Sequence, residues 1–217
     1  MSSCCNSPQS YSGTKIFFSK WSQSYAKKFR KGKLEKVQRY LVHGIMRDPI
    51  SGRRILDIGC GVGSLHLTLL KEGAGKSVGI EMAEGMLDEA KQFAANLGHS
   101  DRAEYHLGDF VQLADTLSEA DITILDKVVC CYEDLDVLID KSTRKTRKIY
   151  ALSHPKENLM MEVAFKTQIL LAKIFKWSFR PYWHDWPRMR SMILARGFDL
   201  VYKDSTVAWQ VLVFKRP

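Results

Sequence analysis

The chain has 217 residues, of which 45% are hydrophobic, 26% charged and 11% aromatic, and its formal net charge is +9. This length suits one sizeable α/β domain rather than two, and the composition argues against a disordered or fibrous protein. We find no uncharged apolar run of about 18 residues and no apolar signal core at the amino terminus, so we expect a cytoplasmic protein. The positive charge favours anionic partners in general and identifies none of them.

The cysteines give no sign of a metal centre. Their number is odd and no CxxC spacing occurs among Cys4, Cys5, Cys60, Cys130 and Cys131. This pattern argues against a disulfide framework and against a structural zinc site. We expect reduced thiols and no bound metal.

The amino-terminal part predicts a tail followed by helices. Residues 1–13 are polar and contain Pro8 and Gly13, so we expect a disordered tail there. Residues 14–47 predict an aromatic-bearing helix and then an amphipathic helix, which together form an amino-terminal helical cap. The basic run over 27–36 is typical of a solvated helix face, with binding of nucleic-acid phosphates as the alternative.

From residue 54 onward, short apolar runs alternate with helical patterns. The predicted strands are 54–58, 77–81, 104–108, 121–126 and 148–153, and the predicted helices are 64–72, 84–97, 111–117 and 134–145. This alternation requires crossover connections, so we expect a mostly parallel sheet covered by helices on both faces. At the end of the chain, Gly197 ends a helix before two strands, 198–203 and 206–214, whose short connection permits only antiparallel pairing.

The stretch ILDIGCGVGSL, residues 55–65, places three glycines where the first strand turns into a helix. Gly59, Gly61 and Gly63 have no Cβ, so the backbone of this turn can approach a ligand closely. The GxGxG spacing lacks the third glycine on which a dinucleotide pyrophosphate usually rests. The turn therefore favours a ligand other than NAD.

Acidic side chains occur at the same edge of the predicted sheet. Glu81 ends the second strand and could accept hydrogen bonds from both ribose hydroxyls of an adenosine. Asp109 follows the third strand and could accept from the adenine amino group, while Phe110 could lie against the ring. Each acid could instead be a helix N-cap. Because these residues follow neighbouring strands in order, we interpret this edge as a ligand-binding crevice.

Together these segments resemble the class I S-adenosylmethionine-dependent methyltransferases, from about Gly52 to Phe214. ILDIGCGVGS is similar to the first motif of that family, VGIEMAEGML to the second, LGDF to the adenine-contacting segment and ITILDKVVCCY to the fourth-strand motif. The resemblance implies a Rossmann-like seven-stranded sheet in the order 3-2-1-4-5-7-6, with strand 7 antiparallel and helices on both faces. The layout is distantly similar to that of magnesium-protoporphyrin methyltransferases and related small-molecule enzymes.

The resemblance also implies a cofactor, S-adenosyl-L-methionine, with S-adenosyl-L-homocysteine as its product. Gly59 and the adjoining backbone would hold the methionine moiety, and Tyr25 would close over the cofactor. The residues expected to bind it are Tyr25, Asp57, Gly59, Cys60, Gly61, Gly63, Glu81, Met82, Gly108, Asp109, Phe110 and Asp126. The family signature (N/D)PP(Y/F) of many nucleic-acid and amino-group methyltransferases is absent after strand four, which argues against such acceptors.

The segment 154–186 is rich in apolar residues and is predicted to be an insert or lid. It contains an amphipathic helical pattern and then a loop crowded with Phe179, Tyr182, Trp183 and Trp186. These aromatic residues either pack in the core or form an apolar acceptor pocket, or else a patch for membrane or protein contact.

Four residues are candidates for the chemistry. Methyl transfer from a sulfonium is an in-line displacement that depends on alignment and water exclusion, so a base is optional. If the acceptor must lose a proton, His154 and His184 are the candidate bases, because imidazole titrates near neutral pH. Asp126 and Tyr132 would border the transferable methyl group and orient the acceptor. Each of the four could instead be structural.

We therefore expect a single-domain enzyme that methylates an oxygen, sulfur or nitrogen atom of a small, partly apolar and anionic molecule. One alternative is an RNA-binding methyltransferase that uses the basic helix 27–36, and another is a catalytically silent regulator that binds the cofactor. A further alternative is a metalloid or thiol methyltransferase that uses the pairs Cys4–Cys5 and Cys130–Cys131, since thiolates favour soft ions.

Overall fold

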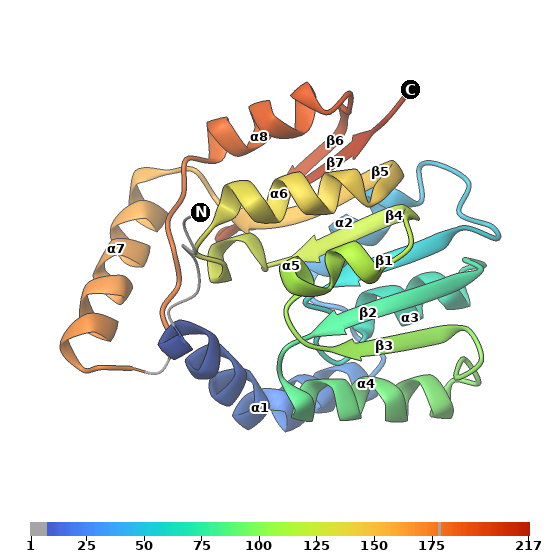
Figure 1. Ribbon diagram of the computed structural model, residues 1–217, viewed down its shortest axis with the longest axis horizontal. Helices are drawn as coiled ribbons and strands as arrows, with labels where there is room; N and C mark the ends of the chain where they lie inside the picture. Colours follow the sequence, from blue (N-terminus) through green and yellow to red (C-terminus); the bar gives the residue numbers. More distant parts are fainter. Residues whose placement is uncertain (1–7, 178) are drawn as a thin grey trace.

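A single seven-stranded sheet forms the centre of the computed structural model, which describes residues 8–177 and 179–217 (Figure 1). The strands are β1 (Arg54–Ile58), β2 (Lys76–Glu81), β3 (Ala103–Leu107), β4 (Ala120–Asp126), β5 (Thr146–Pro155), β6 (Asp199–Ser205) and β7 (Trp209–Lys215). The helices are α1 (Pro8–Arg30), α2 (Lys36–Ile45), α3 (Ser64–Lys71), α4 (Glu84–Asn96), α5 (Phe110–Leu113), α6 (Leu135–Arg144), α7 (Leu159–Ile174) and α8 (Trp186–Ala195), with 3-10 turns η1 (Ala114–Thr116) and η2 (Val129–Cys131). Within the described ranges, no helix combines the length and the apolar character needed to cross a membrane.

The strand order is β3-β2-β1-β4-β5-β7-β6, which confirms the predicted fold class and order. β1 to β5 pair in parallel, because a helix or a longer crossover separates each of them from the next. β7 pairs antiparallel with both β5 and β6, and the turn over 206–208 is too short for any other arrangement.

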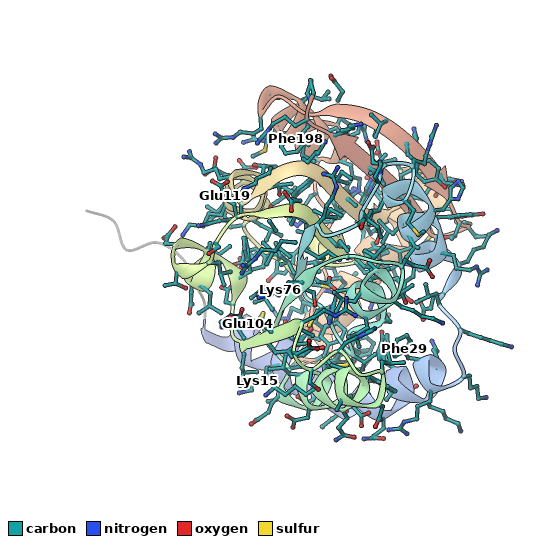
Figure 2. All side chains as sticks on the ribbon, turned by 90° about the vertical axis from the view of Figure 1, so that its right-hand side faces the viewer. Lys15, Phe29, Lys76, Glu104, Glu119 and Phe198 are labelled. Carbon is teal, nitrogen blue, oxygen red and sulfur yellow. The ribbon has the colours of Figure 1, made fainter. Side chains whose placement is uncertain are left out.

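The two faces of the sheet are buried by different helices. Along β5, Ile149 and Ala151 face the layer of α2, α3 and α4, while Tyr150 and Leu152 face the layer of α5, α6 and α8. This alternation follows from the two-residue period of a strand. Phe29 packs on the first layer and Phe198 lies in the second; Figure 2 labels Phe198 near the top of the view and Phe29 lower, on the right.

Several predicted boundaries differ from the structure, and three of the differences have a clear local reason. α1 begins at Pro8, so residues 8–13 are helical rather than part of a tail; a proline at the first helical position loses no intrahelical hydrogen bond. The rest of the predicted tail lies outside the described residues. β5 extends to Pro155 because β7 pairs with it that far. β7 begins only at Trp209, whose N–H donates to Thr206 Oγ1 at 2.9 Å and so closes the preceding turn.

His154 is a fully buried residue of β5. Its ring stacks on that of Trp186 with the centroids 4.8 Å apart, and its Nδ1–H donates to the carbonyl of Pro155 at 2.8 Å. Burial lowers the pKa of His154 to about 4, since the core does not solvate an imidazolium ion. At neutral pH this imidazole is therefore an uncharged packing group.

We expect His154 to reduce the stability of the protein as the pH falls from 6.5 to about 4. In this window the unfolded chain binds a proton on the imidazole and the folded chain does not. The free energy of unfolding should therefore fall by up to about 1.4 kcal/mol per pH unit from this residue. Urea unfolding across the window should show a shallower pH dependence for His154→Phe, which keeps an aromatic ring beside Trp186. Equal pH dependence in both proteins would contradict the expectation.

Candidate active site

A cavity of about 360 Å³ lies at the carboxyl ends of the parallel strands, where open α/β sheets bind their ligands. Its floor comes from the segments that follow β1, β2, β3 and β4. Its cover comes from α1 and α7, which both lie beyond this end of the sheet in Figure 1. The cavity therefore has a polar sheet edge on one side and helices distant in sequence on the other.

Most of the predicted site residues line this cavity. Those that do are Tyr25, Asp57, Gly59, Cys60, Gly61, Glu81, Met82, Gly108, Asp109, Phe110, Asp126 and Tyr132. Gly63 is not in contact with it and instead forms the N-cap of α3. The structure places His154 and His184 outside the lining, so neither candidate base reaches the cavity.

The glycine turn adopts backbone angles that other residues rarely reach. Gly59, Gly61 and Gly63 have φ values of 65°, 55° and 81°. A Cβ at Gly59 would lie 2.5 Å from Val128 Cγ2, whereas a Cβ at Gly61 would meet no atom within 4 Å. Gly59 is therefore needed for packing, and Gly61 leaves open space beside the cavity.

Glu81 binds the glycine turn to the end of β2. One carboxylate oxygen accepts from the Gly61 N–H at 2.9 Å, and the other accepts from the N–H groups of Met82 at 2.8 Å and Ala83 at 2.9 Å. Burial raises the pKa of Glu81, although these three N–H groups favour its charged form. A carboxylate has about four acceptor positions, so the side chain keeps one for a ligand.

Asp109 has the N-cap role that the sequence offered as one alternative, and it also lies at the cavity. It is the N-cap of α5, accepting from the Val111 N–H at 2.9 Å, and it also lines the cavity beside Phe110. The hydroxyl of Tyr132 donates to its second oxygen at 2.8 Å. Tyr132 thus fixes the orientation of Asp109 across the cavity floor.

Asp126 is the centre of a polar network at the end of β4. Its two oxygens accept from Ser153 Oγ at 2.6 Å and from Gln38 Nε2 at 3.2 Å. Gln38 also donates to Ser64 Oγ at 3.0 Å. Burial raises the pKa of Asp126, while the charge of Lys127 opposes this shift. The network connects α2 to the cavity, a role of Gln38 that the sequence did not reveal.

Lys127 is a further residue that the sequence analysis missed. Its backbone is left-handed, with φ 59°, a conformation that is uncommon for a side-chain-bearing residue and often marks a functional position. Its Nζ pairs with Glu35 and lies 5.3 Å from the ring centroid of Trp209. Burial favours the neutral amine, but the charges of Asp126 and Glu35 raise the pKa of Lys127 above its usual value. A positive charge therefore stands at the cavity wall.

Asp57 is paired with a histidine that lies behind the turn. The Nδ1 of His66 lies 2.8 Å from an Asp57 oxygen, and its Nε2 lies 3.0 Å from the Tyr105 hydroxyl. His66 and Asp57 are both buried. We interpret Asp57 as a residue that supports the turn, with His66 as its partner; a lone histidine in the SLHL segment gave no signal of this.

The remaining candidates lie around the rim or behind it. The Nε2–H of His184 donates to the Tyr132 carbonyl at 2.9 Å, and burial lowers the pKa of His184. Trp183 packs on Phe165, with ring centroids 5.6 Å apart, so it lies behind a lining residue. His184 and Trp183 therefore both support the cavity wall from outside.

The sulfur atoms of Cys130 and Cys131 lie 4.0 Å apart at the cavity. Cys4 and Cys5, the other predicted pair, lie outside the described residues. Within 8–177 and 179–217, no three side chains of His, Cys, Asp or Glu gather closely enough to hold a metal ion.

Comparison with known proteins places these features in a family. Residues 50–191 match the family model described as a methyltransferase domain. The ubiquinone biosynthesis O-methyltransferase of Azorhizobium caulinodans is 34% identical over 94 residues, which cover 43% of this chain and 36% of that protein. The chain thus matches only about a third of the length of this relative.

Two solved structures share the fold. Magnesium protoporphyrin IX methyltransferase from Synechocystis, with bound S-adenosylhomocysteine, has a TM-score of 0.67 at 22% identity. The alignment covers 94% of this chain and 100% of that protein's chain. Geranyl diphosphate methyltransferase, in complex with GPP and sinefungin, has a TM-score of 0.66 at 13% identity. The alignment covers 83% of this chain and 76% of that protein's chain.

The family match includes the glycine turn, Glu81, Asp109 and Asp126, which are the residues that converge on the cavity. The sheet order is the one that the resemblance implied. The chain therefore belongs to the methyltransferase domain family, as a class I member that uses S-adenosylmethionine as its cofactor.

Proposed function

We propose that this protein transfers a methyl group from S-adenosylmethionine to an oxygen, sulfur or nitrogen atom of a small, partly apolar and anionic molecule. The observation that carries the proposal is a cavity lined by two unlike sets of residues. The polar set is the glycine turn, Glu81 and Asp109, and the other set is the aromatic side chains and Lys127. Such an arrangement suits two different molecules bound side by side.

The polar set fits the cofactor. Glu81 keeps one acceptor position for a ribose hydroxyl, and a second hydroxyl would replace the Gly61 N–H as its partner. Asp109 accepts one bond on each oxygen and so retains acceptor positions for the adenine amino group. The open space beside Gly61 accommodates the approach of a ligand to the backbone. When bound, the cofactor supplies an electrophilic methyl group on a positively charged sulfur.

The other set fits an apolar acceptor. Phe17 and Phe18 of α1 meet Phe179 with ring centroids 5.0 and 5.4 Å apart, and Phe165 of α7 lines the same space. Among the described lining residues, Lys127 is the cation, so it would bind an anionic group of the acceptor. Magnesium protoporphyrin IX and geranyl diphosphate, named for the two neighbours above, likewise combine apolar and charged parts.

The residues of the cavity align the acceptor and exclude water rather than supply a strong base. α1 and α7 cover the site, and water exclusion favours a displacement in which the sulfur loses its charge. His154 and His184 are not needed in this proposal, since both lie outside the cavity. We assign Asp126 and Tyr132 the role of positioning residues, held by Ser153, Gln38 and Asp109.

Replacement of Glu81 should weaken cofactor binding. Glu81→Gln keeps the shape of the side chain but removes the charge that strengthens hydrogen bonds to ribose, so we expect a loss of more than about 1 kcal/mol, at least fivefold in Kd. Calorimetric titration with S-adenosylmethionine measures it. Glu84→Gln, an exposed residue at the start of α4, is the matched control. An unchanged Kd in a folded Glu81→Gln protein would rule out the ribose assignment.

Replacement of Lys127 should affect the acceptor instead. A labelled-methyl assay on cell extract, followed by mass spectrometry of the labelled product, identifies the acceptor. With that molecule, Lys127→Met should raise KM about tenfold through loss of a charge-assisted bond, while cofactor affinity stays within about twofold. The left-handed backbone tolerates methionine no worse than lysine. If KM for the anionic acceptor is unchanged, Lys127 does not bind its charge.

A further inference from the structure

The helix α7 carries apolar side chains on its outer as well as its inner face. Leu159, Val163, Leu170 and Ile174 follow the spacing of one helical stripe. With their neighbours they form an exposed set, each member 38–76% accessible to solvent: Leu159, Met160, Val163, Leu170, Leu171, Ile174, Phe175 and Trp177. We call this set the α7 outer face. Ala172 is the residue of α7 that is buried.

Such a surface is unusual for a helix surrounded by water. A surface helix normally turns its apolar stripe to the core, and a group of large apolar side chains exposed on the other side marks a binding site. α7 lies at the outer margin of the molecule, away from the sheet layers (Figure 1). The α7 outer face therefore has the character of a docking surface.

The charged side chains around the α7 outer face indicate which kind of partner it binds. The flanking cations Lys166, Lys173, Lys176 and Arg180 are exposed. Two acids occur nearby, and both are in ion pairs, Glu157 with Arg190 and Glu162 with Lys166. Lys173, Lys176 and Arg180 make no ion pair with any residue that the structure describes. An apolar face bordered by cations and ended by a tryptophan is typical of a segment that binds an anionic lipid surface.

A second copy of the chain fits the same face less well. If two α7 outer faces met in a symmetric dimer, their flanking lysines would be brought together at the edge of an apolar contact. Like charges in that position oppose association, whereas anionic headgroups would attract every one of them. The charge pattern thus favours a bilayer over self-association.

We propose that α7 docks this protein on an anionic membrane surface and that the acceptor enters the cavity from the bilayer. The second part rests on the proposed function. α7 has 16 residues and a length of about 24 Å, less than the hydrocarbon thickness of about 30 Å, so it lies in the interface rather than across it. Phe165 and Gln168 of the same helix line the cavity. One helix therefore contacts lipid on its outer side and the acceptor on its inner side.

Sedimentation with vesicles tests this docking. The full chain is mixed with vesicles of phosphatidylcholine alone, or of phosphatidylcholine with phosphatidylglycerol. We expect binding to the anionic vesicles at least tenfold stronger than to the neutral ones, weakened by added salt, with a blue shift of tryptophan emission. Leu170→Glu combined with Ile174→Glu should reduce this binding at least tenfold.

A matched variant controls for added negative charge. Leu200→Glu combined with Val207→Glu makes the same change at exposed apolar positions of the β6–β7 hairpin and should bind vesicles like the wild type. Thermal unfolding checks that both variants fold. Calorimetry with S-adenosylmethionine separates the two proposals, since the α7 variant should bind the cofactor normally. A wild type that binds vesicles but not the cofactor would refute the proposed function alone.

Two results would overturn the docking proposal. One is equal vesicle binding by the α7 variant and the wild type, or no binding by either. The other is a dimer in light scattering that the α7 variant dissociates, without vesicle binding by the wild type. In that case the α7 outer face is an interface between two copies of this chain.

Discussion

The structure depends on the way β2 holds the turn that follows β1. The N–H groups of Gly59 and Cys60 both donate to the Ile80 carbonyl, at 2.8 and 3.0 Å, and Glu81 then accepts from Gly61. The three left-handed glycines make this close approach possible, because any Cβ at Gly59 would collide with Val128. One backbone arrangement thereby opens the cavity and aims the half-buried carboxylate of Glu81 into it. Since a carboxylate withdrawn from water is tolerated only when hydrogen-bonded, Glu81 both stabilises the turn and remains available for a ligand.

The cover of the cavity is held by polar links between elements far apart in the chain. α1 is fixed on α4 by Glu89, which is buried and accepts from Gln23 and from Arg30, the latter at 3.0 Å. α2 reaches the site through Gln38, and Glu35 at its N-terminus pairs with Lys127. Part of the basic segment 27–36 is therefore committed to internal ion pairs rather than free for nucleic acid. The links of α1 attach the cover to α4, and those of α2 place Gln38 and Glu35 against the sheet edge, so closure of the cavity and alignment of its polar groups are parts of one arrangement.

Local patterns predicted the sheet edge well, and long-range packing explains what they missed. The glycine turn, Glu81 and Asp109 are recognisable because each lies at the end of a strand, a place that the hydrophobic period and the glycine residues of the sequence predict. The same reasoning predicts His154 at the sheet edge. In the structure His154 is buried, because Trp186 of α8, an element later in the sequence, stacks on it. Lys127 gave no signal, because its environment comes from Glu35 and Trp209 at the two ends of the sequence. Pro8 and Gly13 indicate a tail when read locally, but α1 begins at Pro8 because proline is compatible with a first helical turn.

These features describe an enzyme in which the sheet edge supplies the polar residues of the cavity and the outer helices supply apolar ones, with Ala172 as the single buried residue of α7. The central claim is that the backbone between β1 and α3, with Glu81, holds the adenosyl group. A crystal structure with S-adenosylhomocysteine tests it most directly. The account predicts density for the ribose within hydrogen-bond distance of Glu81, the adenine beside Phe110 and the amino-acid moiety along Gly59 to Gly61. Density elsewhere on the molecule, or an empty cavity at saturating ligand, would contradict it.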